Sequence, residues 1–132
     1  MAGIKNLDKL LKKMNPSLSP EEYVFCTIDE GKLDPHQLNP LLIFREKEGI
    51  TLIVEKHIAE ANNLSYSGPW SMITLNVHSD LEAVGFLAKI TSALATAGIS
   101  VNVVSAYYHD HLFVPFPLAL KALEIIKGLS EV

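Results

Sequence analysis

The chain is short, moderately apolar and weakly acidic. It has 132 residues, of which 48% are hydrophobic and 20% are charged, and its formal net charge at pH 7 is -4. These values exclude a disordered chain and predict one compact domain, or two very small ones that share a core. The eleven Lys and Arg residues are spread along the sequence, so we expect no nucleic-acid or membrane partner.

The single cysteine and the first residues favour a cytoplasmic protein. Cys26 can form neither an intramolecular disulfide nor a thiolate cage for a metal. Leu7, Leu10, Leu11 and Met14 recur at helical spacing among Lys and Asp residues, which predicts an amphipathic helix rather than a signal peptide. No apolar run reaches the roughly 20 residues of a membrane-spanning helix.

After this helix the sequence predicts a loop, one strand and a second interrupted segment. Residues 16–20 are expected to form a polar loop, and residues 23–28 mix aromatic and β-branched side chains as a strand does. Gly31 and Pro35 then interrupt the chain, so the segment up to residue 40 is expected to be a loop or at most one helical turn.

A hairpin and a short helix are expected to complete the first half. Residues 41–46 and 50–55 are apolar runs joined through Gly49, which can supply the positive φ of a tight turn. Residues 56–63 have helical spacing, and Ser-Gly-Pro at 67–69 is expected to interrupt the chain after them.

The second half opens with a strand and the best-defined helix. Residues 70–78 alternate between apolar and polar side chains, as in a half-buried strand. Ser79 and Glu82 have the spacing of a capping box, which predicts a helix that starts there, and Gly98 is placed as its C′ residue.

A second hairpin and a last helix follow. Residues 99–107 and 111–115 are predicted strands around a turn, and the last helix is expected to begin near Pro117 and to end near Gly128. The sequence of strand and helix at 111–122 repeats that at 50–61, so the chain reads as two related halves. We therefore expect an α+β fold, with helices mainly on one face of the sheet and a homodimer that covers exposed edges.

Two stretches of the second half resemble a known family. Residues 79–90, Ser-Asp-Leu-Glu-Ala-Val-Gly-Phe-Leu-Ala-Lys-Ile, and residues 98–102, Gly-Ile-Ser-Val-Asn, resemble ACT domains, with Val84-Gly85 in place of the usual Pro-Gly pair. With residues 105–107 and 110–115, the chain resembles the ACT pairs of small bacterial proteins related to CASTOR-type amino-acid sensors. The resemblance implies two ferredoxin-like ACT halves: residues 1–69, the N-terminal helix plus a degenerate half, and residues 70–132, a half with an intact first helix.

The same resemblance implies a small-molecule site at the start of that helix, with an amino acid as the expected ligand. The expected ligand-binding residues are Asp80, Leu81, Glu82, Ala83, Val84, Gly85, Ser105 and Asp110. The chemistry agrees, because a helix N-terminus offers free N–H groups to a carboxylate and Asp110 can hold an ammonium group.

Structural roles compete with this interpretation. Glu82 is expected to serve the capping box, Asp80 can stabilise a helix through its dipole, and Asp110 suits a hairpin turn for its own backbone bonding. His109 and His111 lie two residues apart, but no third ligand accompanies them, so we expect no metal site and no cofactor.

Three functions remain open at this point. The first is a ligand-responsive regulatory protein, and the second is an assembly or adaptor module whose ACT-like surface has lost its ligand. The third, an enzyme that uses Asp80, Glu82 or Asp110 as acid and base, is ranked last because no motif specific to catalysis is present. We predict a protein that is not an enzyme.

Overall fold

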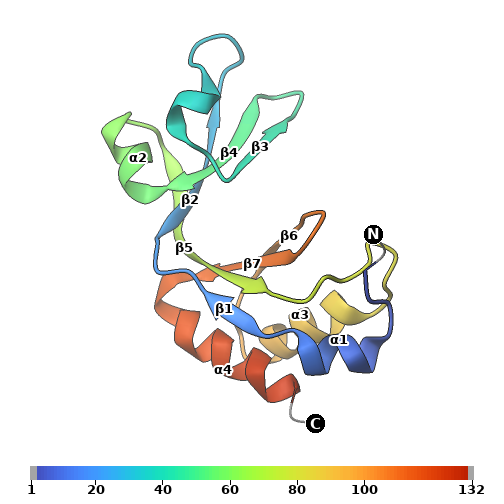
Figure 1. Cartoon of the computed structure of the whole chain (residues 1–132). Coiled ribbons are helices and arrows are strands. Elements are labelled where there is room, and N and C mark those ends of the chain that lie inside the picture. The colour runs from blue at the N-terminus through green and yellow to red at the C-terminus, as the bar shows by residue number, and fades with distance from the viewer. Residues whose placement is uncertain (1–2, 131–132) are drawn as a thin grey trace. The chain divides into compact units, whose positions relative to one another are not determined.

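The computed structural model describes residues 3–130, and they fall into two compact units (Figure 1). Unit 2 is Glu21–Trp70, whereas unit 1 combines the residues up to Pro20 with those from Ser71 onwards. Each unit has its own cluster of buried apolar side chains, so the expectation of one shared core is wrong. The cause is that helices and sheet strands bury their apolar sides separately within each unit.

Unit 2 contains four strands of one seven-stranded sheet, one helix and one helical turn within the described residues. Its elements are β2 (Tyr23–Ile28), η1 (Pro35–Leu38), β3 (Leu42–Arg45), β4 (Ile50–Glu55), α2 (Lys56–Ala61) and the first half of β5 (Tyr66–Leu75). The strands lie in the order β3-β4-β2-β5, and β2 pairs with both β4 and β5 in antiparallel register. The predicted hairpin of β3 and β4 is confirmed.

The first connector of unit 2 is reduced to a single helical turn. Asp34 caps η1 by accepting a hydrogen bond from the His36 N–H at 3.1 Å, and Asn39 ends it with a φ of 48°. Leu38 packs into the cluster around Val24, as does Ala59 of α2, so both helical pieces cover the same face of the sheet. The predicted loop or single turn is confirmed.

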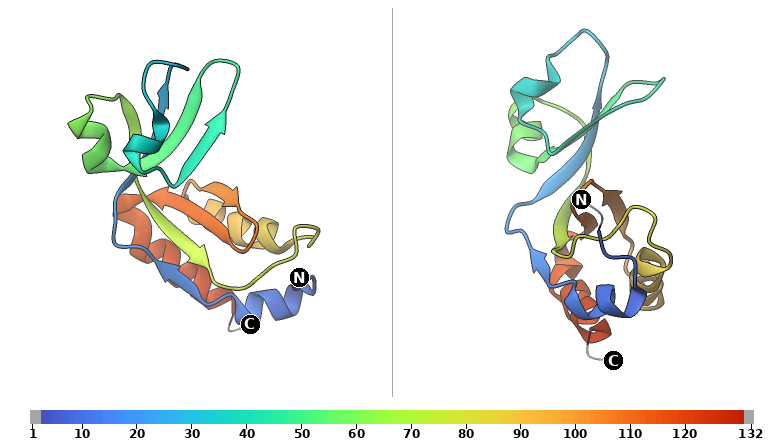
Figure 2. Two further views of the ribbon diagram at one scale, coloured as in Figure 1. Left: turned by 45° about the horizontal axis from the view of Figure 1, so that its top comes forward. Right: turned by 45° about the vertical axis from the view of Figure 1, so that its right-hand side comes forward.

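Unit 1 contains the other strands of this seven-stranded sheet and shares β5 with unit 2, and among the described residues three α-helices pack on its part of the sheet. It contains α1 (Leu7–Lys13), β1 (Pro16–Leu18), the second half of β5, α3 (Phe86–Thr96), β6 (Asn102–Ser105), β7 (Asp110–Pro115), η2 (Phe116–Leu118) and α4 (Ala119–Leu129). The strands lie in the order β1-β5-β7-β6. The helices of this unit lie on one side of its sheet, as expected from the sequence (Figure 2).

Residues 16–18 form the strand β1, although the sequence predicts a polar loop at residues 16–20. Pro16 pairs with Leu75 and Leu18 with Ile73, both in antiparallel register. Proline is tolerated there because β1 is an edge strand, where one side of the backbone needs no partner. The N-terminal segment thus supplies the fourth strand of unit 1.

Gly68-Pro69 lies inside a strand rather than at a break in the chain. These residues were expected to interrupt the chain, but β5 continues through them and the peptide bond between them is cis. The pairing register of β5 with β2 shifts at this point, between Tyr23 and Phe25. A bulge needs no regular ladder hydrogen bond from every residue, which is why proline fits inside this strand.

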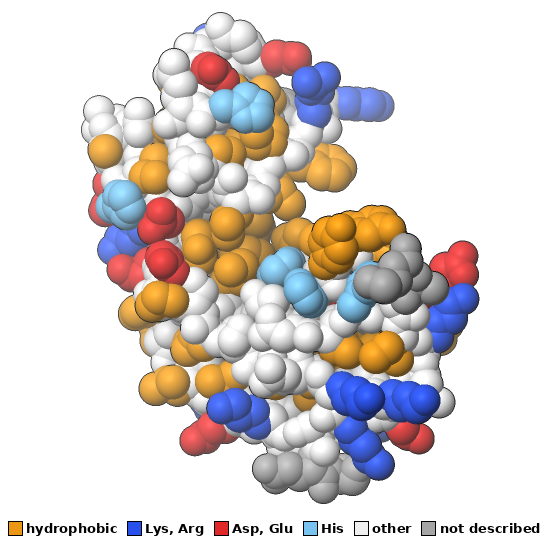
Figure 3. Space-filling model, viewed as in Figure 1, with side chains coloured by type: hydrophobic (Ala, Val, Ile, Leu, Met, Phe, Trp, Pro, Cys, Tyr) orange, Lys and Arg blue, Asp and Glu red, His pale blue; other side chains and the backbone are white. Residues whose placement is uncertain are grey.

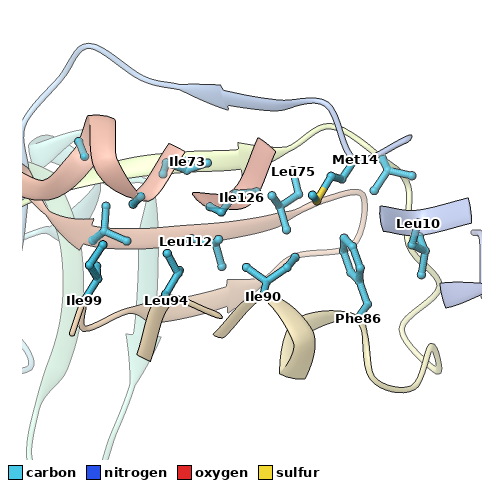
Figure 4. Packing of buried hydrophobic residues seen from close by; sticks show 14 residues of the cluster. Leu10, Met14, Ile73, Leu75, Phe86, Ile90, Leu94, Ile99, Leu112 and Ile126 are labelled. Atoms are coloured by element: carbon cyan, nitrogen blue, oxygen red, sulfur yellow. The ribbon is translucent and has the colours of Figure 1, made fainter. Parts of the chain in front are cut away.

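The core of unit 1 forms between its sheet and its helices (Figure 4). Ile90 and Leu94 of α3 point toward Leu112 of β7 and Ile126 of α4, and Phe86, in the first turn of α3, points toward Met14. Leu10 and Met14, at the N-terminal helix, are fully buried in the same cluster. The predicted amphipathic helix is confirmed, and its apolar side is part of this core.

The two units resemble one another most clearly at their hairpins, β3–β4 in unit 2 and β6–β7 in unit 1. Strands β4 and β7 have the same pattern of buried and half-buried residues along their six positions, and each pairs with the strand that precedes it.

Among the described residues, no helix is long and apolar enough to cross a membrane.

The C-terminal end of α3 agrees with the prediction, whereas that of α4 does not. Gly98 follows α3 with a φ of 76°, and the N–H of Ile99 donates to the carbonyl of Leu94 at 2.9 Å, so the predicted C′ glycine is confirmed. Gly128, in contrast, lies inside α4, which continues to Leu129. Packing of Ile126 and of the partly buried Leu129 against the core extends the helix past the glycine.

Candidate functional site

The loop that precedes α3 is shaped by hydrogen bonds to Asp80. Asp80 accepts a hydrogen bond from the Glu82 N–H at 2.8 Å through its side chain, and another from the Ala83 N–H at 2.9 Å through its backbone carbonyl. Ser79 donates from its hydroxyl to Oδ2 of Asp110 at 2.8 Å. The predicted capping box of Ser79 and Glu82 is therefore wrong, because the serine hydroxyl is committed to the start of β7.

The helix α3 begins at Phe86 rather than at Ser79. Gly85 occupies the N-cap position with a φ of 88°, and no side chain of the described residues caps the helix. The N–H groups of a first helical turn have no partner inside the helix. Gly85 is thus explained by its backbone conformation, which L side chains rarely adopt.

A small cavity of about 130 Å³ lies in front of this helix end. The first turn of α3 lines it through Phe86, Leu87 and Ala88. Of the eight residues predicted to bind ligand, the structure brings six together there: Asp80, Leu81, Ala83, Gly85, Ser105 and Asp110. Asp110 is only 5% exposed, so a carboxylate and the positive end of a helix face one small space.

The other two predicted residues lie elsewhere. Val84 is 84% exposed and is not among the described residues that line either cavity. Glu82 lines a second, larger cavity of about 310 Å³, together with Gly3, His78 and Tyr107. Ser79, Asp80 and Leu81 line both cavities, so the two spaces adjoin along this loop.

Aromatic side chains stand beside the larger cavity. The ring centroids of Tyr107 and Tyr108 are 5.0 Å apart, and that of His78 lies 6.2 Å from Tyr107 and 5.8 Å from Tyr108. Figure 3 shows hydrophobic side chains gathered at the turn between β6 and β7, where the two tyrosines lie. Both tyrosines are mostly exposed, so they form a rim rather than a core.

His109 and His111 lie close together at the start of β7. The rings of His109 and His111 are 6.4 Å apart, and Nδ1 of His111 is 2.9 Å from the hydroxyl of Thr74. Burial lowers the pKa of His111, His109 lowers it further, and Asp110 acts in the opposite direction. Within the described part of the chain, no group of three or more His, Cys, Asp or Glu residues could hold a metal ion.

Cys26 is structural. It lies buried in β2 within the cluster of unit 2. Burial raises the pKa of its thiol, which favours the protonated form over the thiolate.

Sequence reasoning missed part of this site. Ser79 was assigned to the helix cap, and Gly3, His78 and Tyr107 were not singled out, although all three line the larger cavity. The adjacent tyrosines beside a predicted turn were a usable signal, because exposed aromatic pairs often mark binding surfaces. Gly3 had no local signal, because its place beside the loop depends on the tertiary fold.

Two family models match the chain, and both are described as ACT domains. The first matches residues 2–71 and the second residues 67–127. No curated protein sequence matches this chain significantly.

Solved structures of similar fold extend this finding. A Vibrio cholerae protein of unknown function, described as a possible transport protein, is 44% identical, with 98% of this chain and 99% of that one covered and a TM-score of 0.86. An Agrobacterium tumefaciens protein is 18% identical over 83% of this chain and 84% of its own, at a TM-score of 0.69. The ligand-free regulatory subunit of aspartate kinase from Thermus thermophilus is 13% identical over 92% and 100%, at a TM-score of 0.67.

Proposed function

Because this chain belongs to the ACT domain family, we propose that it is a regulatory protein that binds a small molecule, with a free amino acid as the ligand. The observation that carries the proposal is the small cavity at the start of α3, where the buried carboxylate of Asp110 faces an uncapped helix end. The shared fold of the aspartate kinase regulatory subunit supports a regulatory role.

The two charged sides of the cavity match the two charged groups of an amino acid. The first N–H groups of α3 carry about half a positive charge and suit a carboxylate. Asp110 suits an ammonium group, and its hydrogen bond from Ser79 holds one carboxylate oxygen in place. Gly85 has no Cβ, so a ligand can approach the backbone there.

The size of the site also favours a small ligand. A cavity of about 130 Å³ lies below the range of roughly 300 to 1,000 Å³ that is usual for drug-sized ligands. The head group of an amino acid fits this space, and the adjoining larger cavity offers room for its side chain.

The assembly and the location follow from the same proposal. Strand β6 in unit 1 and strand β3 in unit 2 each pair with one neighbour within the described residues. We expect a homodimer that covers such edges, and a cytoplasmic protein that changes the activity of another protein rather than catalysing a reaction. Light scattering of the purified protein tests the dimer.

A ligand screen tests the function. Each of the twenty amino acids is added at millimolar concentration and the melting temperature is recorded; a ligand at 100 times its Kd adds about 2.7 kcal/mol. For each amino acid that shifts the temperature, the N-acetyl derivative and the α-amide serve as matched controls, because each removes one charge of the head group. We expect both derivatives to lose the shift.

The screen also has a contradicting outcome. If no amino acid raises the melting temperature, amino-acid binding is wrong, and the adaptor interpretation becomes the leading one. If the N-acetyl derivative shifts the temperature as strongly as the free amino acid, the role of Asp110 as the ammonium site is wrong.

A further inference from the structure

The loop that lines both cavities is held by the beginning of the chain. The Ile4 N–H donates to the His78 carbonyl at 2.8 Å, and the Asp80 N–H donates to the Ile4 carbonyl at 2.9 Å. These two hydrogen bonds form a short parallel bridge between Ile4 and Ser79. Figure 1 shows the start of the chain, in blue, beside the loop that leads into α3, in yellow.

Gly3 allows this close approach. A Cβ placed on Gly3 would lie 2.6 Å from the Asp80 nitrogen and 2.7 Å from the His78 carbonyl oxygen. Side-chain carbons do not come that close to backbone atoms, so any other residue would push the segment away from the loop. Gly3 also lines the larger cavity, which makes it part of the site wall.

Two side chains extend the contact toward α3. Nζ of Lys5 lies 3.4 Å from Oε2 of Glu82, and Cδ2 of Leu7 lies 3.8 Å from the position that a Cβ on Gly85 would take. Leu7 packs against the core of unit 1, whereas Lys5 and Glu82 are largely exposed and contribute little by themselves. The segment therefore touches the loop at its beginning, its middle and its end.

We propose that residues 3–7 are a positioning segment of the ligand site: they fix the shape of the loop at residues 78–85, and Gly3 forms one wall of the larger cavity. The proposal deepens the proposed function and rests on it for the identity of the ligand. A loop held by few apolar contacts opens easily, so the two backbone hydrogen bonds at Ile4 decide how often the cavity shape is populated. A site populated only part of the time binds its ligand proportionally more weakly.

Gly3→Ala is the direct test, because it adds only the carbon that clashes. Gly128→Ala is the matched control, since a Cβ there meets nothing within 4 Å and its residue lies inside α4. Amide hydrogen exchange is measured for the loop and for β7, and each of the twenty amino acids is titrated into both variants and the wild type.

We expect Gly3→Ala to speed exchange of the Asp80 amide by about tenfold or more, while the amides of β7 exchange as in the wild type. The Kd of any amino acid that binds the wild type is expected to rise by about tenfold, and the melting temperature is expected to stay nearly constant. A purely structural role for Gly3 would instead lower the melting temperature and speed exchange in β7. We expect Gly128→Ala to leave loop exchange and Kd unchanged.

A second variant covers the case in which Gly3→Ala does not fold. Deletion of residues 1–5 removes the bridge but keeps Asn6, whose side chain caps α1 by accepting from the Lys9 N–H at 3.1 Å. Unchanged loop exchange in the folded variants would overturn the proposal, and so would faster exchange with an unchanged Kd. If the loop loosens but no amino acid binds even the wild type, the proposed ligand is wrong, while the positioning of the loop by residues 3–7 stands.

Discussion

Asp110 places the strictest chemical demand on a ligand, because it is a carboxylate that is 5% exposed and faces a helix N-terminus. Its Oδ2 accepts a hydrogen bond from the Ser79 hydroxyl, a bond that an amide oxygen can also accept. Replacing Asp110 by asparagine therefore removes the negative charge of the site and keeps the hydrogen bond that Ser79 donates.

Asp110→Asn is expected to weaken binding of a free amino acid by at least about tenfold, because hydrogen bonds to charged groups contribute about 1.5 to 3 kcal/mol. The free energy of unfolding should change by less than about 1 kcal/mol, since Ser79 keeps an acceptor. Calorimetric titration and urea unfolding measure the two quantities. Asp29→Asn, the same change at an exposed site of unit 2, is the control, and equal losses in both variants would contradict the assignment.

His111 gives stability a pH dependence with a defined sign. Its pKa in the folded protein is lowered, chiefly by burial, so the unfolded chain, with a pKa of about 6.5, takes up the proton first as the pH falls. The contribution of neutral His111 to the free energy of unfolding is fully present well above pH 6.5 and decreases as the pH falls through that value. We predict that urea unfolding of the wild type weakens more than that of His111→Gln between about pH 7.5 and about pH 5.5. A larger pH dependence in the variant would contradict this.

Six predicted site residues meet at one cavity because the resemblance concerned a continuous loop and its two facing strands. What the pattern could not supply was the partner of each polar atom. Ser79 with Glu82 has capping-box spacing, yet the hydroxyl bonds Asp110, which lies 31 residues away. The spacing of neighbouring residues does not show that a distant side chain competes for the same hydroxyl.

Gly85 shows how a single conformation sets the start of a helix. The glycine has a φ of 88°, so α3 cannot extend back past Phe86. The same residue type at Gly128 lies inside α4, where packing against the core overrides its low helix propensity. The sequence alone distinguishes these two environments poorly.

The same substitution should therefore have opposite effects at the two sites. Gly85→Ala forces a Cβ into a left-handed conformation and is expected to destabilise the protein by about 1 to 2 kcal/mol. Gly128→Ala is expected to stabilise it by about 0.5 to 1 kcal/mol, because alanine loses less backbone freedom on folding. Thermal unfolding of the two variants side by side measures both, and destabilisation by Gly128→Ala would show that this helix end is strained.

Strands with long apolar runs could be predicted from the sequence, whereas a short edge strand could not. The hairpins β3–β4 and β6–β7 have long apolar runs around clear turns, and both are found. Strand β1 has three residues and begins with Pro16, so nothing local marks it, and only its pairing with β5 makes it a strand. Short edge strands depend on tertiary partners in this way.

The described residues form two cores, and α1 belongs to that of unit 1. Leu10→Ala is expected to lower the free energy of unfolding of this unit by about 2 to 5 kcal/mol, since the leucine is fully buried and its loss leaves a cavity. Leu41→Ala, at a half-exposed leucine of unit 2, is the control with an expected cost below about 1 kcal/mol. Urea unfolding measures both, and equal costs would show that α1 is not anchored in the core.

The discontinuous make-up of unit 1 has a consequence for synthesis on the ribosome. Unit 2 ends at Trp70, so all of its strands are available once the chain has grown past that residue. Residues 3–20 were made earlier, yet β5, α3 and β7, against which Leu10 and Met14 pack, emerge later. The core of unit 2 can therefore form first, whereas Leu10 and Met14 can be buried in their cluster only after α3, β7 and α4 have been made.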